Sequence, residues 1–386
     1  MAYKVNNLKT EQEEFLKEVL SIKSVNGVDS ERNIAIFLRD YLRKCGVNAA
    51  LQEIDGRHAN VLAVLEGESE ESIIWNGHLD TVPYGKMSEW NTNPEVLVKK
   101  NGCYYVRGAS DMKSGLAAMV WTLGYMKKRG HVPKKTIYFL GTCDEEKGGL
   151  GARKILEQYI LKNPSFMLIG EPTGLLLGTA QKGCIWLKLS VHGKTSHGAY
   201  PWEGVNALEY GYRIYQDLKS QIENKEHPVL GRPTVQMSIA KGGIVPNMTP
   251  DEAEFMLDIR VIPGQTAEWV RAMAEECIEK YHVQTSGTLK VDLSVENQRR
   301  AIEISDDNIW LRRLERELSY CELPKEHIGI NYFTDASIIT LEEPELPVLL
   351  FGPGEPNMAV RRHIVGGANR TLISVKTPSR SCRIGT

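Results

Sequence analysis

The chain has 386 residues, 47 of them basic and 49 acidic, and its formal net charge is −2. This length predicts two or three domains, since a domain usually spans about 100–200 residues. The balanced charge gives no electrostatic basis for binding nucleic acid or an anionic membrane, so we expect a small-molecule partner. No stretch reaches the roughly 18 apolar residues of a membrane span, and the first residues lack an apolar signal core. The sequence therefore predicts a cytoplasmic protein.

The seven cysteines are odd in number and form no C-x-x-C pair. This usage argues against a disulfide framework and against a structural zinc site built from thiolates. We therefore expect any metal ion to be held by carboxylates and histidine.

Helix-like and strand-like segments alternate in the first part of the chain. Apolar residues recur at helical spacing over residues 9–46, interrupted by the turn SVNGVDS, with Ser30 as a candidate N-cap. The following segments are predicted to be strands at 60–66, 72–78 and 136–143 and a helix at 113–129. This alternation predicts an α/β domain whose helices cover the sheet.

The order of elements changes from about Lys182, where strand, helix, strand, strand, helix and strand follow one another. This is the order of a small ferredoxin-like α+β sandwich. A long helix and the strand ELPVLLF return after Asn297. We therefore predict a catalytic domain in two parts, 1–181 and 298–386, with a lid or dimerisation domain inserted at 182–297.

Four motifs place histidine or acidic residues where strand-like segments end. They are WNGHLDTVP, RGASDMKSGLAAMV, TCDEEKG and IGEPTG, which contain His78, Asp80, Asp111, Glu145, Glu146 and Glu171. Each motif alone has a simpler interpretation: a surface pair, a helix N-cap at Asp111, or a solvated acidic loop. Four such motifs in a row indicate a polar site at the carboxyl edge of the sheet. Histidine with several carboxylates suits a zinc-type site for metal-assisted hydrolysis.

The neighbouring acids Glu145 and Glu146 cannot point in one direction, so one is expected to bind metal and the other to face a substrate water.

These motifs, with GKTSHGAYPWEGVNA and GGIVPNMTPDEAEFMLDIRVIP, resemble in their order those of a two-zinc deacylase and exopeptidase family. It includes acetylornithine deacetylase, succinyl-diaminopimelate desuccinylase, aminoacylase and glutamate carboxypeptidase. The resemblance extends over about residues 10–358. It implies a zinc-exopeptidase-like catalytic domain with a large mixed sheet, an inserted ferredoxin-like domain, a homodimer, and two Zn²⁺ ions with Co²⁺ or Mn²⁺ as alternatives.

The resemblance also implies a role for each motif residue. His78 and Glu171 would bind one metal, Glu146 the second, and Asp111 would bridge the two. Asp80 would orient His78 and fix its tautomer.

Glu145 would be the general base, taking a proton from a water and passing it to the leaving amine. The Asp–Met peptide bond after position 111 is expected to be cis.

Residues of the inserted domain and beyond are implied in substrate binding. His197 is similar to a family histidine that polarises the scissile carbonyl, often from a dimer partner. Asn247 and Arg260 resemble positions that hold the substrate carboxylate, although Arg260 equally suits a structural salt bridge. Thr334 in YFTDAS resembles a further substrate contact.

The pattern breaks near the end of the chain. Val360 stands where the family has its last metal-binding histidine, and His363 follows three residues later with no acid after it. Residues 360–386 contain six Lys or Arg and no Asp or Glu. We hypothesise that the reading frame shifts near codon 360; resequencing the gene would refute this if the frame proved unbroken. With a genuine tail, His363 would be the candidate substitute ligand.

The sequence thus predicts a metal-dependent hydrolase that cleaves the amide bond of an N-acyl amino acid, such as acetylornithine or succinyl-diaminopimelate. Two alternatives remain. One is a dipeptidase or carboxypeptidase of the same family, because no residue fixes the side-chain pocket. The other is a catalytically impaired member that only binds ligand or dimerises.

Overall fold

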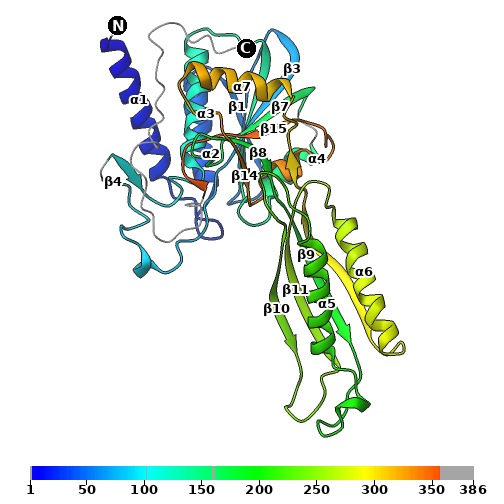
Figure 1. The fold of residues 1–386 in the computed structure, drawn as a ribbon. Helices are drawn as coiled ribbons and strands as arrows, with labels where there is room; N and C mark the ends of the chain where they lie inside the picture. Colours follow the sequence, from blue (N-terminus) through cyan, green and yellow to red (C-terminus); the bar gives the residue numbers. More distant parts are fainter. Residues whose placement is uncertain (1, 101, 159–160, 357–386) are drawn as a thin grey trace. The chain divides into compact units, whose positions relative to one another are not determined.

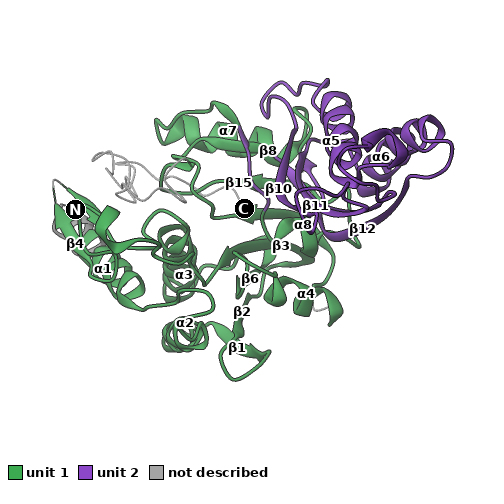
Figure 2. Cartoon of the chain, turned by 90° about the horizontal axis from the view of Figure 1, so that it is seen from below, with its two compact units in different colours: residues 1–179, 304–328, 334–386 green, residues 180–303, 329–333 purple. Residues whose placement is uncertain are grey.

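The computed structural model describes residues 2–100, 102–158 and 161–356 (Figure 1). The chain forms two compact units (Figure 2). Unit 1 takes in residues 1–179, 304–328 and the chain from 334 onward, and unit 2 takes in residues 180–303 and 329–333. Among the described residues, no helix has both the length and the apolar character that a membrane crossing needs.

Unit 1 is built around a mixed sheet, in the strand order β1-β2-β6-β3-β7-β15-β8. The strands are β1 (Asn48–Glu53), β2 (Ala59–Leu65), β3 (Ser69–His78), β6 (Lys135–Thr142), β7 (Pro164–Ile169), β8 (Leu177–Gln181) and β15 (Val348–Leu350). The central strands β6, β3, β7 and β15 are parallel to one another, whereas β2 pairs with β6 and β8 with β15 in antiparallel directions. Their nearly continuous apolar sequences suit parallel strands, which are buried on both faces.

The helices of unit 1 pack on this sheet and on one another, with α2 over β1 and β2 and α3 over β3. They are α1 (Ala2–Ser21), α2 (Arg32–Lys44), α3 (Lys113–Lys128), α4 (Leu150–Glu157), α7 (Ile309–Tyr320) and α8 (Ala336–Ile339). A short hairpin of β4 (Val98–Lys100) and β5 (Cys103–Tyr105) precedes α3, and β14 (His327–Ile330) pairs with β8. The predicted mixed α/β fold is confirmed.

The start of α2 differs from the sequence-based expectation. Ser30 does not cap this helix, because its hydroxyl donates to the carbonyl of Arg57. Glu31 occupies the N-cap position but forms no capping hydrogen bond. Its carboxylate is instead turned into the protein, where it accepts a hydrogen bond from the amide of Asp144.

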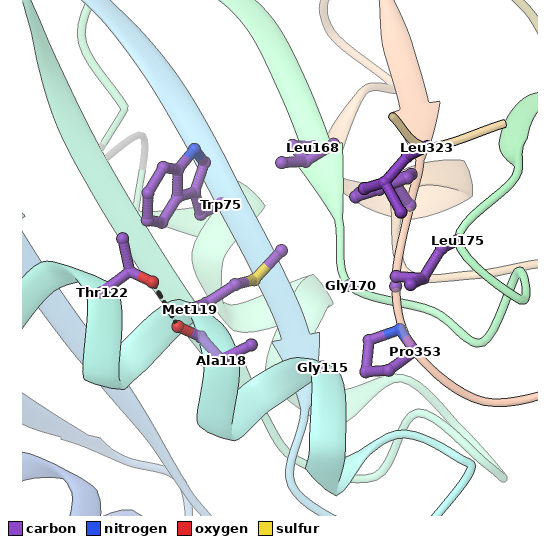
Figure 3. A pocket seen from close by; sticks show the side chains of 12 residues that line it. Trp75, Gly115, Ala118, Met119, Thr122, Leu168, Gly170, Leu175, Leu323 and Pro353 are labelled. Carbon is purple, nitrogen blue, oxygen red and sulfur yellow. Dashed lines mark hydrogen bonds between the residues drawn. The ribbon is translucent and has the colours of Figure 1, made fainter. Parts of the chain in front are cut away.

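An apolar hollow of about 260 Å³ opens between α3 and the sheet (Figure 3). Trp75 and Leu168 contribute from strands β3 and β7, and Met119 from the helix. Its lining is almost entirely apolar, so it offers little to a charged ligand group. None of the predicted site residues that the structure describes lines this hollow. The lining residues are Trp75, Gly115, Ala118, Met119, Thr122, Leu168, Gly170, Leu175, Leu323, Phe351, Gly352 and Pro353.

Unit 2 has the element order and strand order of a ferredoxin-like sandwich. Its antiparallel sheet runs β10-β11-β9-β12, and helices α5 and α6 pack together against the sheet (Figure 1). The elements are β9 (Gly183–His192), α5 (Ala207–Ile222), β10 (Thr234–Gly242), β11 (Glu252–Val261), α6 (Ala267–Gln284), β12 (Lys290–Arg299) and β13 (Ile302–Glu303). Asn206 and Thr266 cap the two helices through their side-chain oxygens, as N-cap residues do.

Gly115 controls how closely α3 approaches the end of β7. A Cβ atom at this position would lie 1.9 Å from the carbonyl oxygen of Gly170. This oxygen belongs to the backbone, so it can move aside only at a cost in free energy. Replacing Gly115 with Ala is expected to lower the free energy of unfolding by about 3 kcal/mol, because overpacking forces the backbone to shift. Urea unfolding of G115A against wild type measures this.

Gly56 provides the matched control, since a Cβ there meets nothing within 4 Å. The G56A change should stay within about 0.5 kcal/mol of wild type. Equal stability of G115A and G56A would contradict the tight contact between α3 and the end of β7.

Candidate metal centre

The parallel strands bring the predicted site residues to one edge of the sheet. His78 is the last residue of β3 and lies in register with Thr142, the last residue of β6. On the other side of β3, Asn76 is in register with Ile169, the last residue of β7. Because parallel strands end at the same edge, the residues that follow them meet there.

A cluster of buried and half-buried side chains forms at this edge. The Nε2 atom of His78 lies 3.0 Å from Oδ1 of Asp111 and 3.8 Å from Oε1 of Glu171. One candidate ligand atom from each of His78, Asp111 and Glu146 lies within 4.8 Å of the others. The structure therefore gathers four of the five predicted metal ligands, His78, Asp111, Glu146 and Glu171, from four separate segments of the chain.

Burial and the proximity of several carboxylates shift the pKa values of this cluster. Burial and the nearby Asp111 carboxylate raise the pKa of Glu146 to about 8. Burial also raises the pKa of Glu145 and of Glu171 well above the ordinary value for glutamate. Burial pulls the pKa of His78 down, but its contacts with Asp111 and Asp80 outweigh this effect and raise it. The cluster thus favours bound positive charge.

The donor atoms fit a divalent metal ion. Within the described part of the chain, Oε1 of Glu146 and Oε2 of Glu171 are buried without a hydrogen-bond partner. A buried carboxylate oxygen without a partner is costly, and a cation beside it removes that cost. One imidazole nitrogen with several carboxylate oxygens is a donor set that zinc and similar ions accept.

Asp111 lies two residues before the first residue of α3 but does not cap the helix. The N-cap position belongs to Met112, which forms no side-chain capping bond, and the Asp111–Met112 peptide bond is cis, as the resemblance implies. The Asp111 carboxylate accepts a hydrogen bond from His78 instead. The helix-cap interpretation of Asp111 is therefore wrong.

Asp80 has a wider set of contacts than the sequence indicates. Nδ1 of His78 lies 3.0 Å from the main-chain oxygen of Asp80 and 3.5 Å from its carboxylate. The carboxylate accepts hydrogen bonds from the amides of Glu145 and Glu146, each at 3.1 Å. Burial works against the ionised form, but His78 and Asn26 lower the pKa of Asp80. Asp80 therefore holds the loop that carries the two glutamates.

Three buried polar residues behind this loop escaped the sequence analysis. Asn26 and Glu31 lie in and beside the turn SVNGVDS, which predicted only a break between helices. Asp144 adopts a left-handed backbone with φ of 60°, and its main-chain oxygen accepts from Gly148 and Gly149. No spacing rule identifies these contacts, because each joins segments more than 50 residues apart or depends on loop conformation.

The remaining predicted residues of unit 1 lie elsewhere or outside the described chain. Thr334 is buried just before α8, where its hydroxyl oxygen accepts from the amide of Ala336. The negative charge of its neighbour Asp335 contributes to the raised pKa of Glu145. Val360 and His363 lie outside the described residues.

His197, Asn247 and Arg260 belong to unit 2. The exposed His197 accepts a hydrogen bond from the amide of Ala199 through Nδ1. The amide of Gly198 donates to the carbonyl of Asn247 at 2.8 Å, so these two loops are neighbours.

Arg260 lies on β11, where its guanidinium forms two hydrogen bonds with Asp258, at 2.7 and 3.1 Å. The guanidinium also lies over the ring of Phe333. The geometry of this pair is that of a structural salt bridge, while one planar face of the arginine remains stacked on an aromatic ring.

The sequence profile of peptidase family M20/M25/M40 matches residues 74–363, more than half of the chain. The chain belongs to this family. The resemblance inferred from the motifs is therefore confirmed, and so is the expectation of a hydrolase that acts on amide or peptide bonds.

Two curated relatives of the family are deacylases by name. A probable succinyl-diaminopimelate desuccinylase of Staphylococcus aureus is 26% identical over 379 residues, covering 90% of this chain and 92% of the relative. An acetylornithine deacetylase of Vibrio cholerae is 27% identical over 360 residues, covering 90% of this chain and 91% of the relative.

Two solved structures share the fold. The aminopeptidase PepT of Bacillus cereus has a TM-score of 0.72 at 18% identity, covering 90% of each chain. The Bacillus subtilis YXEP protein, described as a dinuclear metal binding peptidase from the M20 family, has a TM-score of 0.66 at 16% identity, with the same coverage.

Glu31 provides a pH-dependent test of the network behind the site. Burial, followed by the charge of Asp80, raises the pKa of Glu31 to about 8, against about 4.5 in the unfolded chain. Between these values the folded state keeps a proton that the unfolded state has lost, so stability from this group is lost as pH rises. The variant E31Q cannot lose that proton.

In EDTA, the stability of E31Q relative to wild type is therefore expected to rise by about 3 kcal/mol between pH 5 and pH 8. Denaturant unfolding at several pH values measures this difference. The exposed Glu157 is the control, and E157Q should follow the wild-type pH dependence. A pH-independent difference between E31Q and wild type would contradict the raised pKa.

Proposed function

We propose that the chain is a two-zinc hydrolase that cleaves the amide bond of an N-acyl amino acid. The observation that carries this proposal is the cluster of His78, Asp111, Glu146 and Glu171, in which two buried carboxylate oxygens lack hydrogen-bond partners among the described residues. The membership of the M20/M25/M40 family and the names of the curated relatives support it.

His78 and Glu171 would hold one metal ion and Glu146 the other, with Asp111 between them. Zinc is the proposed metal because the donors are one imidazole and several carboxylates, and Co²⁺ and Mn²⁺ are alternatives with similar donor preferences. When bound, the ions would polarise the amide carbonyl and make a water molecule more acidic.

Glu145 is proposed as the group that moves the proton. Its amide is fixed by Asp80, which sets the direction in which its carboxylate leaves the loop. Its pKa is raised by burial, and a general base works best when its pKa lies near the working pH. Glu145 would take the proton of the attacking water and give it to the departing amine.

The substrate side of the proposal rests on unit 2. His197 is proposed to donate a hydrogen bond to the scissile carbonyl, and Asn247 and Arg260 to hold the carboxylate of the substrate. Thr334 is proposed as a further contact. The adjacent loops of His197 and Asn247 support their roles. The role of Arg260, whose fork is paired with Asp258, is supported by the resemblance to the family alone. The proposal includes a homodimer formed through the inserted unit and the cytoplasmic location that the sequence predicts.

The first experiment measures metal content per chain by elemental analysis, together with amine release from N-acetyl and N-succinyl amino acids and from dipeptides. Two metal ions and turnover of an N-acyl substrate are expected. Turnover of dipeptides alone would assign the peptidase branch. Fewer than two metal ions without turnover of any substrate would refute the enzymatic proposal and leave a ligand-binding protein.

Two variants separate the proposed base from a proposed ligand. E145Q should keep both metal ions and lose about 10²–10⁴-fold in kcat, the usual contribution of a general base. E146Q should lose one metal ion per chain, because an amide oxygen is a much weaker ligand than a carboxylate. Elemental analysis and steady-state kinetics of both variants measure this. Loss of metal in E145Q with retention in E146Q would reverse the two roles.

A further inference from the structure

Asn26 is held beside the end of β3 by its own main chain. Its amide donates to the carbonyl of Thr81 at 2.9 Å, and the amide of Thr81 donates to the carbonyl of Ser24 at 3.0 Å. The hydroxyl of Ser24 donates to the carbonyl of Leu79 at 2.7 Å. Residues 24–26 therefore run parallel to residues 79–81 as a short extra pairing next to the sheet.

The side chain of Asn26 joins two carboxylates. Its Nδ2 atom donates to Oδ2 of Asp80 at 3.0 Å and to Oδ1 of Asp144 at 2.9 Å. A side-chain amide nitrogen carries two hydrogens, so each carboxylate receives one of them. Asn26 is only 8% exposed, and Asp80 and Asp144 are also buried. Both hydrogen bonds therefore form away from bulk water, where a lost donor is costly.

These two aspartates set the path of the loop after β6. Asp80 accepts from the amides of Glu145 and Glu146. Asp144 closes the following turn, since its main-chain oxygen accepts from Gly148 and Gly149. A single side chain from the turn between α1 and α2, Asn26, thus connects the end of β3 with the start of the loop that carries the two glutamates.

We infer that Asn26 is a positioning residue that fixes the directions of the Glu145 and Glu146 side chains through Asp80 and Asp144. Asn26 itself touches neither substrate nor metal in this role. Without its amide, two buried carboxylates would face each other without the donor they share, and their repulsion would move the loop. The consequence for metal binding rests on the proposed function, whereas the consequence for loop order does not.

The test compares three variants of the full chain. N26A removes the donor, and N26D keeps the shape but replaces the donor with a third carboxylate. The control is N308A, which removes an asparagine whose side chain caps α7 by accepting from the amide of Trp310. Asn308 makes no contact in the described structure with the loop, so N308A controls for a general loss of stability in unit 1.

Hydrogen exchange followed by mass spectrometry is measured first, in EDTA, at temperatures equally far below the Tm of each variant. N26A is expected to increase the exchange rate of the amides of residues 143–149 at least tenfold, and N26D at least as much. N308A should leave this segment at the wild-type rate. An unchanged rate in N26A, or an equal change in N26A and N308A, would overturn the inference.

Zinc affinity, measured by calorimetric titration of the metal-free proteins with Zn²⁺, is the second readout. N26A is expected to weaken binding about tenfold, with kcat lowered and KM for the active substrate nearly unchanged. Wild-type affinity in N26A would overturn the positioning role at the metal ligands. If the wild-type protein itself binds no Zn²⁺, the proposed function fails, while the exchange measurement still decides the role of Asn26 in the loop.

Discussion

The structure depends on one electrostatic constraint: several carboxylates and one imidazole must be buried together where parallel strands end. The register of β3, β6 and β7 brings His78, the glutamates after β6 and Glu171 to one edge of the sheet. Asp111 joins them from the segment between β5 and α3. Taking like charges out of water is unfavourable, and the raised pKa of Glu146 expresses this cost. Without a cation, the neighbouring carboxylates of this site lower the stability of the fold. A bound cation would remove this cost, so the site is well suited to hold one.

The residues around this charged centre fix the positions of its loops. Asp80 ties the glutamate loop to the end of β3, and Gly115 lets α3 approach the residue before Glu171 at backbone contact. These supports are directional hydrogen bonds and close backbone contacts rather than apolar bulk, so they fix direction more than they add stability. The glutamate loop is held by the short side chains of Asp80 and Asn26, and not by long flexible ones.

The sequence predicts much of this arrangement from local patterns. Apolar runs that end at His78 and Thr142 indicate buried strands, and acids directly after such runs indicate a common edge. The same patterns could not predict that Asp80 bonds to the amides after β6 or that Asn26 bridges two carboxylates. These contacts join segments that are distant in the chain, and asparagine in a turn next to glycine has an adequate local explanation. Ser30 shows the reverse case, where a good local cap signal yields to a tertiary hydrogen bond with Arg57.

The site is assembled from strand ends that lie far apart in the sequence, and this affects the order of folding. His78 and Glu171 meet only after β3 and β7 have paired across more than 90 residues. Contacts of such long range form late, because the chain must first lose the entropy of a large loop. A nascent or cleaved chain that ends before β7 therefore lacks a complete ligand set, and a metal ion would select and stabilise only the chain in which the central sheet is complete.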